Sequence, residues 1–456
     1  MTEDRHQRRS IFPGLLLIVL GAIFLLHRFD PSFGVGHLIR VYWPLLIILW
    51  GVAKLIDHLA AQRTGQSRPP LLSGGEAALL ILLAFVLIAF GLRDWLRERF
   101  PGLDIEVAPF QQAFSQSRQL TAQEIPPGAH VLIETARGSI TVHGGDGHDL
   151  RAGVNESSPG ANESAADARM KSVDVIIEQT ANGYSVHPVH QIDFPGAVTV
   201  DLDVQVPKTA SLTLHTSHGD ISASAIGGVI DAHTENGDIE IHDAASDVFA
   251  QVQVGHARIM GVGGNVSLKV RGSDVEIADV VGDVTVNGPA VGSTVVRKAG
   301  KATHVTSPWA DLTIVQLNGR LEMDSGDIEV SDVAGPARIQ THNKDVTAEN
   351  VAGQLDIVSS HGDVKVVYLT PPAAALNVTN DSGGVDVTLP VKSSFQVAAF
   401  SRSGDVNSDF EDPSLTTAHE SEDGRLNGQF GGKSGSPGPK ITITTSYGTI
   451  ELHKSS

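Results

Sequence analysis

The chain has 456 residues and no cysteine, which excludes disulfides, thiolate metal sites and a cysteine nucleophile. Residues 1–100 hold 11 Lys+Arg against 7 Asp+Glu, a net charge of +4, whereas residues 101–456 hold 22 against 45, a net charge of −23. The two parts therefore belong to different surroundings, and the acidic second part excludes nucleic acid as a partner because it repels phosphate.

Three apolar, nearly uncharged stretches in residues 1–100 predict three transmembrane helices, at about 11–27, 38–56 and 77–92. Trp43 and Trp50 in the second stretch are typical of membrane interfaces. Residues 1–100 are thus expected to form a helical membrane region, with the lipid bilayer as its partner.

The distribution of basic residues predicts how this region is oriented. Positive charges gather before the first span and around the connection between the second and third: Arg5, Arg8, Arg9, Lys54, Arg63 and Arg68. Because cytoplasmic loops are enriched in Lys and Arg, we expect a multi-pass protein of the cell membrane with a cytoplasmic N-terminus and an extracytoplasmic C-terminal domain.

Beyond residue 130, short β-branched alternations are interrupted by Gly-Asp or similar pairs, as in HGDIS at 218, NGDIE at 236, GSDVE at 272 and SGDIE at 325. The recurring aspartates are Asp220, Asp238, Asp274, Asp327, Asp345 and Asp363. Their gaps of 18, 36, 53, 18 and 18 residues are close to multiples of 18, and degenerate copies (GHARI at 255, GSTVV at 292, WADLT at 309) fill the longer gaps. A fixed period of this length indicates a solenoid.

One repeat unit, GDIEIHDAASDVFAQVQV, contains two alternating runs separated by a polar turn, so each coil has two strands. We therefore predict an all-β fold, a single-stranded β-solenoid (β-helix) of about 18-residue coils over residues 211–410. Residues 101–210 are expected to hold an N-terminal β cap and the start of the repeat domain. Residues 411–456 are expected to form a C-terminal loop and a closing hairpin.

Residues 110–454 resemble the bacterial putative-adhesin family of β-strand repeat domains, whose function is poorly defined. The features that carry the resemblance are PPGAHVLIETARGSITVHG, VDLDVQVPKTASLTLHTSHGDI and the recurring GD-[IV]-x-[IV] coils. Residues 8–60, with RRSIFPGLLLIVLGAIFLL and YWPLLIILWGVAKLI, are similar to the transmembrane region of LiaI/LiaF-type envelope-stress proteins. The resemblance implies a repeat fold and a place in cell-envelope sensing, and it supplies no catalytic motif.

Two kinds of residue invite a metal hypothesis. Turn aspartates in one phase could collect Ca²⁺ as a ladder of carboxylates, but aspartate after glycine also stabilises tight turns. The histidines that stand out are His187, His190, His218, His342 and His361, whose scattered spacing favours solvated turn residues. We expect no catalytic, cofactor-binding or metal-binding residue, and leave open whether the aspartates bind Ca²⁺.

These observations predict a membrane-anchored extracytoplasmic β-repeat binding module that is not an enzyme and acts in cell-envelope stress sensing or organisation. Its partner would be an envelope protein or a surface ligand. A surface adhesin is the first alternative and a glycan-processing β-helix enzyme the second, because such enzymes also place acidic residues on one solenoid face. Partner, binding face and oligomeric state are left open.

Overall fold

The computed structural model describes residues 112–160, 162–191, 197–272, 274–289, 292–420, 423–431 and 438–456. In these ranges the chain is all-β, with 32 strands and one short helix, α4 (Glu163–Met170). None of the described helical structure is long and apolar enough to cross a membrane. The three predicted transmembrane spans lie outside the described residues, and every described strand belongs to a compact unit of residues 111–456.

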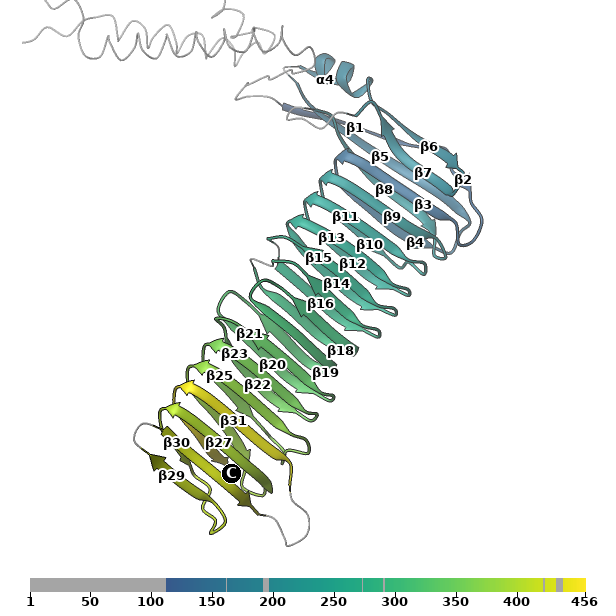
Figure 1. Ribbon diagram of the computed structural model, residues 1–456. Coiled ribbons are helices and arrows are strands. Elements are labelled where there is room, and N and C mark those ends of the chain that lie inside the picture. Colours follow the sequence, from purple (N-terminus) through teal and green to yellow (C-terminus); the bar gives the residue numbers. More distant parts are fainter. Residues whose placement is uncertain are drawn as a thin grey trace, which may run out of the picture. The chain divides into compact units, whose positions relative to one another are not determined.

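Each repeating coil contributes one strand to each of two parallel sheets, as the stack in Figure 1 shows. We call the sheet of strands that follow the glycine corner of each coil face A, and the sheet of strands that precede it face B. On face A, Ile221 pairs with Ile239 and Ile239 with Ala257, and on face B, Ile230 pairs with Val248. Every one of these steps is 18 residues, which confirms the predicted period.

The first half of the stack is listed here strand by strand. Face A contains β4 (Ile140–Gly145), β10 (Ile221–Ser224), β12 (Ile239–Ala244), β14 (His256–Val262), β16 (Asp274–Val280) and the first part of β18 (Thr294–Thr306). Face B contains β3 (His130–Arg137), β9 (Ser211–His218), β11 (Ile230–Asn236), β13 (Val248–Val254), β15 (Val266–Val270), β17 (Val284–Asn287) and the second part of β18. Neighbours within each face pair in parallel.

The chain reverses its direction in the middle of the stack. Strand β19 (Ala310–Met323) runs antiparallel to β18 and also to β20 (Asp327–Val333) and β21 (Ala337–Thr341). The turn is tight, since the Ser307 N–H donates to the Ala310 carbonyl at 2.8 Å. The expectation that the WADLT segment is one more parallel coil is therefore wrong. Its apolar alternation fills the core equally well in either direction, so spacing alone did not reveal the reversal.

Parallel stacking resumes after this reversed coil. Face A continues through β20, β22 (Asp345–Val351), β24 (Val364–Val367), β26 (Val385–Pro390), β32 (Ile450–Ser455) and β28 (Val406–Ser408). Face B continues through β21, β23 (Leu355–His361), β25 (Leu376–Ser382), β31 (Lys440–Tyr447) and β27 (Phe395–Ser403).

The C-terminal strands do not form the closing hairpin expected within residues 411–456. Strand β31 lies between β25 and β27, and β32 lies between β26 and β28, so together they make one whole coil inserted as the last but one of the stack. The end is covered instead by β30 (Asp423–Phe430), antiparallel to β27, and by β29 (Thr416–Glu420), antiparallel to β30. The sequence ITITTSYGTIELH suggested a hairpin because it contains two strands around a turn, but the turn is a solenoid corner.

Further strands cover the N-terminal end, the first on each face parallel to the stack and the outer ones antiparallel. On face A, β8 (Thr199–Pro207), β5 (Asp149–Gly160) and β1 (Gln112–Gln119) extend the sheet beyond β4, while β2 (Gln123–Glu124) pairs with β5. On face B, β7 (Gly183–Val189) and β6 (Asp174–Thr180) extend it beyond β3. Asn162 caps the N-terminus of helix α4, since its side chain accepts the Ala165 N–H at 2.9 Å, and the helix buries Ala166 and Met170.

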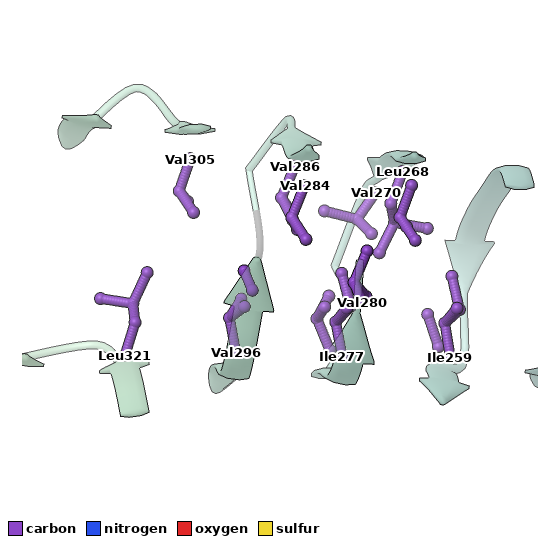
Figure 2. Close-up of a cluster of buried hydrophobic side chains, with 14 of the residues drawn as sticks. Ile259, Leu268, Val270, Ile277, Val280, Val284, Val286, Val296, Val305 and Leu321 are labelled. Atoms are coloured by element: carbon purple, nitrogen blue, oxygen red, sulfur yellow. The ribbon is translucent and has the colours of Figure 1, made fainter. Parts of the chain in front are cut away.

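The core is one continuous narrow layer of aliphatic side chains between the two faces. Figure 2 shows two opposed rows in the middle of the stack: Ile259, Ile277 and Val296 from face A point toward Leu268 and Val286 from face B. A thin core of this kind has room for Val, Ile, Leu and Ala. The large aromatic rings gather instead in the C-terminal end, where Phe395, Phe410 and Phe430 pack together.

Candidate functional site

Several coils turn from face B to face A at a glycine with a backbone conformation that other residues rarely adopt, whereas the corner before Asp345 has Lys344 in that place. Gly219, Gly237 and Gly255 have φ angles of +151°, +148° and +142°. A Cβ atom on Gly237 would lie 2.0 Å from the carbonyl oxygen of Gly219, and one on Gly255 would lie 2.1 Å from that of Gly237. The stacked corners therefore leave no space for a side chain.

The aspartate that follows the corner residue, which is Gly219, Gly237 or Lys344, holds the next coil. The Asp220 Oδ1 atom accepts the Asp238 N–H at 2.8 Å, Asp238 accepts the His256 N–H at 2.7 Å, and Asp345 accepts the Asp363 N–H at 2.8 Å. A carboxylate that accepts a backbone N–H satisfies a donor that would otherwise be left unpaired at the corner. These aspartates therefore form a structural ladder along the corner.

The predicted aspartates differ in position. Asp274 belongs to the ladder, since it accepts the Ser293 N–H at 2.7 Å, and so does Asp363, which accepts the Gly384 N–H at 2.7 Å. Asp327 instead begins β20 directly after the turn from β19, where its own N–H donates to Asp324 at 2.8 Å. The SGDIE motif at 325 thus marks a hairpin rather than a solenoid corner, a consequence of the reversed coil.

Buried hydroxyl and amide groups complete the corners, and the sequence analysis missed them. The Thr216 hydroxyl donates to the Gly138 carbonyl at 3.0 Å, the Thr234 hydroxyl to the Gly219 carbonyl at 3.1 Å, and the Ser401 hydroxyl to the Gly448 carbonyl at 2.7 Å. Each stands three residues before its own corner glycine. A recurring Thr, Ser or Asn at that position, as in TSHGD, TENGD and SRSGD, was the signal.

The opposite turn has a shorter ladder of the same kind. Asp247 accepts the Asn265 N–H at 2.7 Å, Asn265 accepts the Asp283 N–H at 2.9 Å, and Asp283 accepts the Ala302 N–H at 3.0 Å. Most repeating polar residues at the turns are thereby committed to stacking.

Alternating charges cross four consecutive coils on face A, and we call them the charge row: Glu240, Arg258 and Glu276 share one register position, and Arg297 stands two residues further along the next strand, opposite Ala278. The Arg258 Nε lies 3.1 Å and the Arg297 Nη1 2.6 Å from Glu276 carboxylate oxygens, while an Arg258 Nη1 lies 3.8 Å from Glu240. Hydrogen bonds from Arg297 and then Arg258 hold the pKa of the Glu276 carboxyl below its usual range. An open groove of about 510 Å³ runs along the row, bordered by the corner residues Asp238, His256 and Asp274.

The family of the chain is identified by a profile match over residues 199–453, which is more than half of the chain. The match covers the solenoid from β8 to β32. The chain belongs to the Toastrack DUF4097 family. A second profile, the LiaI-LiaF-like transmembrane region, matches residues 11–55 ahead of the Toastrack domain. Both resemblances suggested by the sequence are thereby confirmed.

Solved structures similar to this Toastrack chain are distant. A putative cell adhesion protein from Clostridium sporogenes is 7% identical with a TM-score of 0.16, and the alignment covers 75% of this chain and 100% of that one. Putative adhesins from Bacteroides fragilis and Parabacteroides distasonis are 11% and 8% identical, with TM-scores of 0.17 and 0.21, over 75% and 74% of this chain and 98% and 97% of theirs. At TM-scores this low, these structures indicate nothing about the function of the chain. No curated protein matches the chain.

The histidines singled out from the sequence do not converge on one site. His342 and His361 follow each other at the corner of successive coils, where the His361 N–H donates to the His342 carbonyl at 2.8 Å. His218 precedes a corner glycine, and the His187 ring contacts the Ser185 hydroxyl at 3.0 Å. His190 has a φ of +67° at the end of β7. In the described part of the chain, none of the five belongs to a group of side chains close enough to hold one metal ion.

One mixed cluster stands at the C-terminal end of face A in the Toastrack domain. The His453 ring nitrogens lie 3.2 Å from Asp409 and 3.1 Å from Glu451, and Asp386 is 3.8 Å away. Hydrogen bonding to Asp409, and then to Glu451, raises the pKa of His453, whereas burial and then the Glu451 charge raise the pKa of Asp386. Among the described residues, Asp386, Glu451 and His453 are the set whose ligand atoms all lie within 4.8 Å of one another.

Because of this cluster, we expect the stability of the C-terminal end of the stack to depend on pH. A histidine whose folded pKa is raised stabilises the fold below its unfolded pKa, about 6.5, and the contribution is lost as the pH rises through the folded pKa. His453 links β32 to Asp409 after β28, so amide hydrogen exchange in residues 403–412 should be faster at pH 8 than at pH 6 after correction for intrinsic rates. His453→Gln should abolish this difference. The His304 ring contacts the uncharged Thr313 hydroxyl, so His304→Gln should keep the difference between the two pH values. Equal exchange at both pH values in the unmodified chain would contradict the prediction.

Proposed function

We propose that this chain is a non-catalytic binding module of the cell envelope, tethered to the membrane by its N-terminal region, with a role in stress sensing or envelope organisation. The observation that carries the proposal is the presence on one chain of a LiaI-LiaF-like transmembrane region at 11–55 and a Toastrack solenoid at 199–453. This combination supports a long repetitive surface that is tethered to a membrane.

The fold supports recognition through its faces. Corner and turn side chains such as Asp220, Thr234 and Asn265 are used to stack one coil on the next. Several outward side chains of face A, such as Glu240, Arg258 and Arg297, are instead charged and partly exposed, and the outward residues vary from coil to coil. Surfaces built from rigid strands hold such side chains at fixed spacing, which suits non-covalent recognition of another surface.

The chemistry of the charge row supports a role other than catalysis. Glycoside hydrolysis needs a carboxylic acid whose pKa is raised so that it can donate a proton. Glu276 has the opposite environment, since two arginines hold it ionised. The row is better suited to ion pairing than to proton transfer.

The proposal includes three transmembrane spans, at about 11–27, 38–56 and 77–92, with the Toastrack domain outside the cytoplasm. The basic residues that flank these stretches support the orientation through the positive-inside preference. Limited proteolysis of intact spheroplasts carrying a C-terminal tag tests it. Loss of the tag supports the proposed orientation, whereas a tag protected until the membrane is opened contradicts it.

The partner is tested by crosslinking in the source membranes. The full-length tagged chain is crosslinked with a lysine-reactive reagent, solubilised and captured, next to a control chain that keeps residues 1–111 and lacks the Toastrack domain. Enrichment of a defined membrane sensor or transporter over the control supports the envelope role. Identical protein sets in both samples contradict a protein partner. Adhesion to surface glycans is then the hypothesis to test, by binding of the chain to whole cells.

A further inference from the structure

The His453 cluster brings two carboxylates and an imidazole nitrogen together on face A. Asp386 on β26 and Glu451 on β32 occupy the same register position, so their side chains leave the sheet next to each other. His453 stands two residues after Glu451 on β32 and therefore points to the same side of the sheet. One ligand atom from each of the three residues lies within 4.8 Å of the other two.

The distances within the cluster match those between the ligands of a small cation. The His453 Nε2 atom lies 3.1 Å from a Glu451 carboxylate oxygen and 3.8 Å from an Asp386 carboxylate oxygen. Ligand atoms bound at about 2.0 to 2.1 Å around a tetrahedral Zn²⁺ ion are about 3.3 Å apart, which falls between these two distances. A cation here would also relieve the repulsion between two like charges on neighbouring strands.

The second ring nitrogen of His453 has the partner that metal-binding histidines have. Its Nδ1 atom lies 3.2 Å from an Asp409 carboxylate oxygen, and that same oxygen accepts the Lys454 N–H at 3.2 Å. Histidines that bind metals almost always donate one ring N–H to a carboxylate, a carbonyl or water, which fixes the tautomer. With the Nδ1 proton donated to Asp409, the free lone pair is on Nε2, the nitrogen next to Asp386 and Glu451.

We propose that Asp386, Glu451 and His453 form a binding site for Zn²⁺, with Asp409 as the positioning residue. One imidazole nitrogen with two carboxylate oxygens suits Zn²⁺ better than Ca²⁺ or Mg²⁺, which prefer oxygen ligands alone. The three side chains are 50%, 42% and 44% exposed, so water can complete the coordination. The inference goes beyond the proposed function and does not depend on it.

The charges near the site also favour a cation. Three carboxylates surround the His453 ring. One lysine, Lys365, neighbours Asp386 in the register on the other side. The Lys454 ammonium lies instead over the Phe410 ring, 5.2 Å from its centre. The surplus of negative charge raises the local concentration of cations.

A near-copy of the sequence motif on face A shows why the register matters. Strand β12 carries Glu240 and His242 in the sequence IEIH, whereas β32 carries its Glu-His pair in IELH. The His242 ring contacts its glutamate in the same way, at 2.9 Å. The residues beside Glu240 are Ser222 and Arg258, so neither neighbouring strand offers a second carboxylate at that register position. Stacking of β32 on β26 therefore makes the site, and β12 provides a matched control.

Isothermal titration calorimetry with Zn²⁺ near neutral pH tests the site in the full-length chain, purified without a histidine tag in detergent micelles and freed of metal. We expect one tightly bound ion per chain that excess Ca²⁺ or Mg²⁺ does not displace. His453→Gln and Asp386→Asn should each weaken binding about a hundredfold or more, and Asp409→Asn about 10- to 100-fold. Asp409→Glu keeps the carboxylate and should recover most of the affinity. The control His242→Gln should bind like the unmodified chain.

Amide hydrogen exchange gives a second readout, because an ion held by β26 and β32 links two neighbouring coils. Zn²⁺ should slow exchange in residues 385–390 and 450–455 of the unmodified chain and have no such effect in His453→Gln. Far-UV circular dichroism verifies folding, and Asp386→Asn, which keeps the His453 contacts with Asp409 and Glu451, replaces His453→Gln if that variant is unfolded. Undiminished Zn²⁺ binding in both variants, or binding of Zn²⁺ no tighter than that of Ca²⁺, overturns the inference, and neither result affects the crosslinking test of the proposed function.

Discussion

Gly237→Ala should destabilise the Toastrack domain strongly, whereas Gly326→Ala, in the near-identical motif SGDIE, should have little effect. Gly237 has a φ of +148°, and a Cβ there would lie 2.0 Å from the Gly219 carbonyl oxygen. A strained backbone together with overpacking predicts a loss of roughly 3 kcal/mol or more. At Gly326 the nearest atom to a Cβ, on Asp324, is 3.9 Å away, so the change should stay within about 0.5 kcal/mol.

The measurement is the urea midpoint of unfolding, followed by far-UV circular dichroism. The two substitutions are chemically identical and lie in NGDIE and SGDIE, so a difference between them reports the local structure alone. Equal losses at the two glycines would mean that residues 324–327 form an ordinary corner and that β19 is not reversed. Equal tolerance would mean that the corners are not stacked as closely as the strand pairing requires.

Arg118→Ala should open the N-terminal edge of face A. The Glu156 side chain is 1% exposed, and its carboxylate is held by the Arg118 guanidinium at 2.9 Å and the Gln116 amide at 2.6 Å. Arg118 also lies 2.8 Å from Asp174 on β6, which ties the two faces together. Removing one partner of a buried ion pair leaves an uncompensated charge, and because Arg118 is partly exposed we expect a loss of about 3 kcal/mol. Amide exchange in β1 and β5 should rise accordingly.

Two further variants test whether the loss of stability in Arg118→Ala comes from the buried charge of Glu156. Arg151→Ala removes an arginine of the same edge whose partner, Asp149, is exposed, and it should change stability by less than about 1 kcal/mol. The double variant Arg118→Leu with Glu156→Leu removes both buried charges and should recover most of the stability. If Arg118→Ala were as mild as Arg151→Ala, water would have to reach Glu156, and its burial beneath β1 would be incorrect.

The 18-residue coil was predictable because its causes are local. Alternation at positions such as Ile239 and Ile241 marks a strand, and Gly237 with Asp238 marks a corner. The reversed coil was not predictable, because the alternating apolar positions of β19 read the same in both directions. What differs is the turn at Ser307, a short-range feature that no period encodes.

The residues of the candidate site were likewise predictable only where the signal is local in the sequence. The corner aspartates were found from the sequence, although their role as caps of the next coil became clear only from their contacts. The charge row is invisible until the register places Glu240, Arg258 and Glu276 side by side, since they are 18 residues apart in the sequence. The cluster at His453 was even less predictable from the sequence, because Asp386 and Glu451 become neighbours only through the insertion of β32 between β26 and β28.

The position of that inserted coil has a consequence for the order of events during synthesis. Strands β27 and β28 are made before β31 and β32, yet in the finished fold their parallel partners are those two later strands. The coil of β27 and β28 therefore has no parallel neighbour to stack on until residues 440–455 have been synthesised and, in an exported protein, translocated. This part of the stack closes after the others, and a chain cut short before residue 440 lacks the coil on which β27 and β28 stack.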